Sequence, residues 1–100
     1  MSVYFVLTQT INDHERYSAE YVPAVMPFLT KHGGEVLAAD FQATPLEGQP
    51  AAGAVIIKFP SESSVRQFLD DPAYQPIKEL RLSLTTNANA VMVPEFQPPE

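Results

Sequence analysis

Apolar residues alternate or run together in four short segments, and each of these segments predicts a β-strand. The segments are residues 3–8, 35–41, 54–59 and 87–93. In the first segment, Val3, Phe5 and Leu7 point to one side of the strand, whereas Tyr4 and Val6 point to the other. A strand that is apolar on both sides must be covered on both sides.

The segment between the first two strands has the periodicity of a helix with one buried face. Its apolar positions are Tyr17, Tyr21, Val25, Phe28 and Leu29. Asn12 and Asp13 are suitable N-cap residues, and Gly33 can adopt the left-handed conformation that ends a helix. Pro23 and Pro27 each lack an N–H donor, so we expect either a kink or a second helix that begins near Val22.

The segment after the third strand predicts a helix that is interrupted once. Ser61 is the expected N-cap, and the inward positions are Val65, Phe68 and Leu69. Asp71 followed by Pro72 predicts the cap of a second helix. The apolar positions of that second helix are Tyr74, Ile77, Leu80 and Leu84. Tyr74 is expected to fill the space beneath the break.

The order of the elements is therefore βαββαβ, which predicts an α+β, ferredoxin-like fold. In this fold a four-stranded antiparallel sheet carries its helices on one face, and the crossovers are right-handed. Residues 1–93 form the domain, with a surface loop at 42–53 that is rich in Pro and Gly. Residues 94–100, with three prolines, form a tail that can extend across a neighbour rather than pack on its own domain.

The face of the sheet without helices predicts a homodimer. It carries Tyr4, Val6 and members of the set Leu37, Ile56 and Met92. If they stayed uncovered, these side chains would form an apolar patch of roughly several hundred Å², which is larger than monomers usually expose. Covering such a patch is worth on the order of ten kcal/mol, at ~25 cal/mol per Å², before the costs of association. We therefore expect two copies to pack sheet to sheet as a dimeric α+β barrel.

Composition excludes several classes of function. The net charge is −6 and the six Lys and Arg residues are scattered, which argues against binding of nucleic acid. The chain has no Cys, so disulfides, thiol nucleophiles and thiolate metal sites are impossible, and a reducing cytoplasm fits. No apolar run approaches the ~20 residues of a membrane helix. His14 and His32 have no carboxylates at metal-ligand spacing, so we expect neither a metal nor another cofactor.

Arg81 is the first candidate for a ligand-binding residue. It lies beside an apolar helix face, where its guanidinium could hold a ligand carboxylate through two hydrogen bonds. Two other interpretations are open. Arg81 could pair with Asp70 or Asp71, or it could extend to water.

Tyr17, Tyr21 and His32 are the remaining candidates for ligand binding. The two tyrosines lie one helical turn apart, so they either present hydroxyls to a cleft or pack in the core. His32 either transfers protons at the rim of a pocket or interacts with the last carbonyls of its helix. Asp40 could be a base and Lys58 could point into the barrel, but a strand-end aspartate normally faces water and Lys58 suits a rim position equally.

Five short motifs follow one another in a characteristic order along most of the chain. They are His32-Gly33-Gly34, Leu46-Glu47-Gly48, Phe59-Pro60-Ser61, Pro72-Ala73-Tyr74 and Arg81. From about residue 4 to residue 93, this order and spacing resemble the bacterial "domain of unknown function 1330" family. The resemblance implies the dimeric α+β barrel fold. That family has no established reaction, and its relatives by fold include cofactor-independent monooxygenases, isomerases and dehalogenase-like proteins.

The chain departs from the family pattern after its Gly-Gly strand. Family members often carry a basic residue and glycines there, whereas this sequence has Ala39, Asp40 and Phe41. An anion site built on that basic residue would be missing here or reversed in sign.

Three functions remain open from the sequence. The first is a cofactor-independent small-molecule enzyme with a pocket between helices and sheet, which would use Arg81, Tyr17, Tyr21 and His32. The second is a non-catalytic homodimeric module that binds a metabolite or a partner protein. The third is a structural dimer without a pocket.

Overall fold

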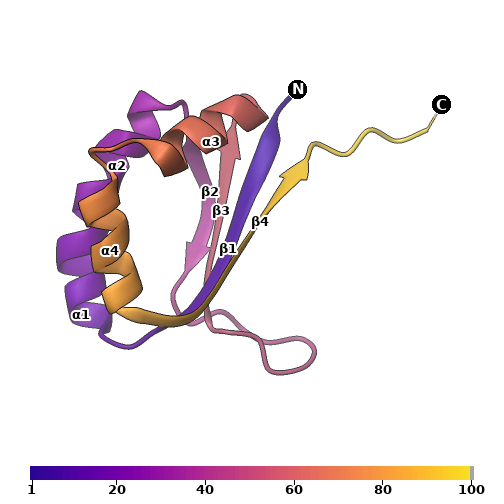
Figure 1. The fold of residues 1–100 in the computed structure, drawn as a ribbon. Coiled ribbons are helices and arrows are strands. Elements are labelled where there is room, and N and C mark those ends of the chain that lie inside the picture. Colours follow the sequence, from indigo (N-terminus) through magenta and orange to yellow (C-terminus); the bar gives the residue numbers. More distant parts are fainter. Residues whose placement is uncertain (100) are drawn as a thin grey trace.

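In the computed structural model, which describes residues 1–99, one antiparallel sheet contains four strands in the order β2-β3-β1-β4. The strands are β1 (Val3–Ile11), β2 (Glu35–Asp40), β3 (Gly53–Phe59) and β4 (Thr85–Pro94). The helical elements are α1 (His14–Arg16), the π-helical turn η1 (Tyr17–Tyr21), α2 (Val22–Lys31), α3 (Glu62–Asp70) and α4 (Gln75–Ser83). All of them cover the same face of the sheet (Figure 1). The predicted ferredoxin-like α+β fold is confirmed.

Strand β1 organises the core because it lies in the middle of the sheet and alternates along its whole length. Its helix-facing residues are Val3, Phe5, Leu7, Gln9 and Ile11, all of which are buried. The apolar members of this row pack with Ile57 and Phe59 of β3 against apolar side chains of the helices. The strand continues three residues beyond the predicted end at Thr8, and Gln9 is thereby placed in the buried row.

The first helical segment changes its hydrogen-bonding pattern immediately before Pro23. The Val22 N–H donates to the Tyr17 carbonyl, five residues earlier, and the regular helix α2 starts at Val22, as one of the two predicted alternatives requires. Proline cannot donate to the preceding turn and clashes with it, and a wider π-turn accommodates this. The result buries both Tyr17 and Tyr21 with their rings 5.0 Å apart.

The second helical segment is interrupted between α3 and α4, as predicted, but the cap differs from the prediction. Asp71 Oδ1 accepts a hydrogen bond from the Ala73 N–H at 3.0 Å, so it stabilises the turn that contains Pro72. Helix α4 begins only at Gln75, and its N-cap residue is Tyr74. The assignment of Asp71 as the α4 cap was therefore wrong. The proline after Asp71 sets a short turn before the helix can continue.

The opposite face of the sheet has no covering helix (Figure 1). Ile56, Val91 and Val93 are exposed there, and Tyr4 and Val6 are half-buried. Met92 does not belong to this face. It pairs with Phe5 in the sheet register and packs against the core on the helix side, so it drops out of the set whose direction the sequence left open. Alternation could not settle its direction because residues 90–93 are apolar on both sides of β4.

Beyond β4, the Glu95 N–H donates to the Ser2 carbonyl at 3.0 Å, and the chain then extends away from the body of the domain (Figure 1). Within residues 1–99, the helices are too short or too polar to cross a lipid bilayer.

Candidate functional site

A cavity of about 90 Å³ lies between the helices and the sheet. Its walls include Phe5 and Leu7 from β1 and Tyr17 and Tyr21 from the π-turn, and most of its surface is apolar. Arg81, from the last turn of α4, contributes a positive charge to this lining. A structural dimer without a pocket is therefore not what the structure shows.

Arg81 is buried in the structure, with only 7% of its surface exposed. Its Nη1 donates to Gln9 Oε1 at 3.0 Å. Within residues 1–99, no carboxylate forms an ion pair with this guanidinium, and Gln9 is the acceptor that its side chain meets. Neither the predicted pairing with Asp70 or Asp71 nor the extension to water is realised. The cavity is therefore lined by a buried cation that meets no anion among residues 1–99.

Gln9 connects Arg81 to Tyr17. Its Nε2 donates to the Tyr17 hydroxyl at 2.7 Å, and only 1% of the residue is exposed. Because a guanidinium can only donate, the Gln9 oxygen must face Arg81 and the amide nitrogen must face Tyr17. Sequence reasoning missed Gln9 because the predicted strand ended at Thr8. The signal was present, since Val3, Phe5, Leu7, Gln9 and Ile11 continue the same spacing.

The pKa values of Tyr17 and Tyr21 are both raised in the cavity. Burial raises the pKa of Tyr17, although the hydrogen bond from Gln9 and the charge of Arg81 oppose the shift. Burial and the neighbouring Tyr74 hydroxyl raise the pKa of Tyr21 far above its usual range. The Tyr21 and Tyr74 oxygens are 3.0 Å apart, so one hydroxyl donates to the other. The side chain of Tyr74 fills the break between α3 and α4, as predicted, and it also lines the cavity.

His32 does not join the other three candidates. It follows α2, and its Nε2 lies 2.9 Å from Asp71 Oδ2, which also accepts from Lys31 Nζ at 2.9 Å. Hydrogen bonds from Lys31, His32 and the Ala73 N–H hold the pKa of the Asp71 carboxyl well below its usual range. This cluster ties the end of α2 to the α3–α4 turn. Arg81, Tyr17 and Tyr21 thus meet in the cavity, whereas His32 has a structural contact elsewhere.

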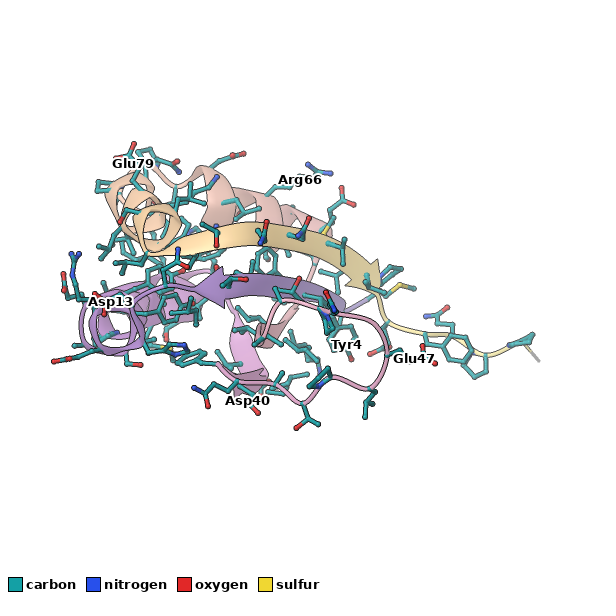
Figure 2. The ribbon with its side chains drawn as sticks, turned by 90° about the horizontal axis from the view of Figure 1, so that it is seen from below. Tyr4, Asp13, Asp40, Glu47, Arg66 and Glu79 are labelled. Carbon is teal, nitrogen blue, oxygen red and sulfur yellow. The ribbon has the colours of Figure 1, made fainter. Side chains whose placement is uncertain are left out.

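The other polar candidates from the sequence lie outside the cavity. Asp40 is exposed and accepts a hydrogen bond from the Gln42 N–H, and Lys58 is paired with Tyr4 in the sheet register, on the side away from the helices. Five charged residues are labelled at the periphery of the molecule in Figure 2: Asp13, Asp40, Glu47, Arg66 and Glu79. Within residues 1–99, no group of three or more His, Asp or Glu side chains could hold a metal ion.

Comparison with known proteins gives a family and a fold. The model of the family described as "Domain of unknown function (DUF1330)" matches residues 2–96. No sequence among the curated proteins matches the chain.

Solved structures of the same fold are similar over most of their length. A protein of unknown function from Rhodopseudomonas palustris has a TM-score of 0.74 at 14% identity, covering 97% of this chain and 84% of that chain. SnoaB, a cofactor-independent oxygenase from Streptomyces nogalater, has a TM-score of 0.68 at 17% identity, covering 99% and 98%. A dimeric ferredoxin-like protein of unknown function from Thermobifida fusca has a TM-score of 0.53 at 17% identity, covering 92% and 89%. At these identities the likeness concerns the fold.

Proposed function

Since the chain belongs to the DUF1330 family, whose description assigns no function, we propose from the site itself that the cavity binds a small organic anion held by Arg81. The observation that carries this proposal is a buried guanidinium that lines the cavity and has no carboxylate partner within residues 1–99. Burying an ion costs several kcal/mol unless an opposite charge meets it. This cost is comparable with the whole free energy of unfolding of a small domain. A ligand carboxylate or enolate supplies that charge.

The remaining donors of the cavity fit the same ligand. Within residues 1–99 the Arg81 guanidinium donates one hydrogen bond, to Gln9, whereas a guanidinium has five N–H groups. The Tyr17 hydroxyl already accepts from Gln9, so its own proton can be donated to a ligand oxygen. A carboxylate can accept two hydrogen bonds from one guanidinium and a third from a hydroxyl at the same time.

The first form of this function is catalysis without a cofactor. Arg81 and Tyr17 would stabilise negative charge that develops on a substrate oxygen, in a cavity whose apolar walls strengthen such interactions. The description of SnoaB as a cofactor-independent oxygenase supports this form by analogy of fold. Loss of one such donor typically lowers kcat by about 10²–10³.

The second form is a non-catalytic module that holds a metabolite. Two observations favour it: the cavity residues within 1–99 include no His, Asp or Glu, and the pKa values of Tyr17 and Tyr21 are raised. A catalyst that abstracts a proton needs a base within reach, and this lining supplies none.

We also propose that two copies pair through the open face of the sheet. Ile56, Val91 and Val93 are exposed there in a single chain, and burial of such a row favours association. The Thermobifida fusca protein of the same fold is described as dimeric.

Calorimetric titration with butyrate and with its neutral amide, butyramide, tests the binding proposal. We expect butyrate to bind and butyramide to bind at least tenfold more weakly, because only butyrate brings a charge to Arg81. Arg81→Met should abolish the difference, and Arg66→Met, at an exposed arginine, is the matched control. Equal affinity of wild type and Arg81→Met for butyrate contradicts the proposal. Conversion of a bound acid to a new species in NMR spectra would select the catalytic form.

A further inference from the structure

The cavity is too small to enclose most organic acids. A cavity of 150 Å³ accommodates a benzene ring, so 90 Å³ holds about four non-hydrogen atoms. A carboxylate group and one further carbon already have that size. Any larger acid whose carboxylate reaches Arg81 must therefore leave the cavity through its opening.

The opening lies between α2 and β2. Among the cavity residues, Met26 of α2 is 44% exposed, Val36 of β2 is 39% exposed and Ala39 of β2 is also exposed. Val36 and Ala39 are paired with Ile57 and Val55, which line the same cavity, so they lie on its helix side. Both residues are exposed on that side, and the cavity residues at the opening, Met26, Val36 and Ala39, are apolar.

Polarity thus changes from one end of the site to the other. Arg81 and Tyr17 form the buried polar end of the cavity, with 7% and 2% of their surfaces exposed. Gln9 lies behind them and is hydrogen-bonded to both. The acidic residues of β2 do not line the cavity. Glu35 and Asp40 are paired with Lys58 and Ala54, which alternate with the inward residues of β3.

We propose that the ligand is a monocarboxylic acid with an apolar body, which enters carboxylate first and leaves its body in the α2–β2 opening against Met26 and Val36. This assignment rests on the proposed function and adds to it the orientation and the chemical class of the ligand. A second carboxylate at the far end of the ligand would be placed on apolar side chains without a cation to meet it. The site therefore selects against dicarboxylates of the same length.

Titration with straight-chain monocarboxylates from acetate to octanoate tests this orientation. Acetate fills the cavity, so each further methylene reaches the opening and should raise the affinity about three- to fourfold, up to about hexanoate. Octanedioate should bind at least tenfold more weakly than octanoate. An affinity that stays flat beyond acetate, or equal binding of octanedioate, overturns the proposal.

A pair of surface variants locates the apolar body. Met26→Ser should weaken hexanoate severalfold and leave acetate unchanged, whereas Leu82→Ser, at an exposed residue of α4 outside the cavity lining, should change neither. Unchanged binding of hexanoate by Met26→Ser overturns the orientation. Failure of all carboxylates to bind the wild type, or equal binding by Arg81→Met, instead overturns the proposed function.

Discussion

Replacement of Arg81 by methionine should stabilise the ligand-free protein while it removes binding. Methionine keeps most of the unbranched stem that packs between α4 and the sheet, and it removes the guanidinium. The buried charge has no carboxylate partner within residues 1–99, and burial of an unpaired ion costs several kcal/mol. A charged residue that serves ligand binding lowers the stability of the ligand-free protein, so its removal should raise the free energy of unfolding.

The opposing term is the hydrogen bond that Arg81 donates to Gln9. Its loss leaves Gln9 Oε1 buried without a donor, at a cost of about 1–3 kcal/mol. We therefore expect the free energy of unfolding to rise by about 1–2 kcal/mol, with Tm higher by about 4–8 °C for each kcal/mol. The double variant Gln9→Met/Arg81→Met removes the orphaned oxygen and should add about 1 kcal/mol more.

Urea unfolding followed by circular dichroism measures these differences, at one protein concentration because association would contribute to stability. Arg66→Met is the control, since the exposed pair of Arg66 with Glu62 should change stability by less than about 0.5 kcal/mol. A fall of more than about 2 kcal/mol for Arg81→Met would refute the reasoning, because the guanidinium would then support the fold itself.

Three further predictions concern other parts of the structure. The pKa of Asp71 is lowered in the folded state, so as pH falls the carboxylate is protonated in the unfolded state first. Its contribution to the free energy of unfolding is therefore complete above about pH 5 and is lost as pH falls through the folded pKa. Asp71→Asn should reduce the loss of stability that urea titrations show between about pH 5 and pH 3, and an unchanged profile would contradict this. Gly53→Ala places a Cβ 2.7 Å from the backbone carbonyl oxygen of Gln9. This contact should lower the free energy of unfolding by about 1–3 kcal/mol in the same assay. An unaltered unfolding midpoint would show that β1 and β3 can move apart at this point without cost. Val91→Glu puts a charge on the exposed face of the sheet and should convert a dimer to a monomer in sedimentation velocity, whereas Leu82→Glu should not; a wild type that sediments as a monomer would remove the dimer.

The spacing of apolar residues, together with the prolines and glycines that interrupt or end helices, was sufficient to predict the fold. The strands and both helical interruptions follow from apolar spacing, from Pro23 and from the Asp71-Pro72 pair. Gly33 takes its predicted left-handed conformation with φ of 77°, and Ser61 accepts the predicted capping hydrogen bond from the Ser64 N–H. These features are local, so the sequence around each one is enough to determine it.

The composition of the site depended on contacts between distant residues, which the sequence does not give. Arg81 and Gln9 are separated by 72 positions, and nothing near Arg81 in the sequence distinguishes this partner from Asp70 or Asp71. His32 meets Asp71 across 39 positions, which removes it from the cavity. The aromatic pair was ambiguous for another reason: Tyr17 and Tyr21 are both core residues and cavity residues, so neither of the two readings excludes the other.

The most direct test is the Nε–H resonance of Arg81 in nitrogen–proton NMR spectra during titration with hexanoate. The chain has three arginines, and spectra of Arg81→Lys identify the resonance that belongs to residue 81. We expect this resonance to shift with saturation at the affinity found by calorimetry, while the signals of the exposed Arg16 and Arg66 remain in place. If hexanoate binds and the Arg81 resonance does not move, the anion is held elsewhere and Arg81 is not its binding residue.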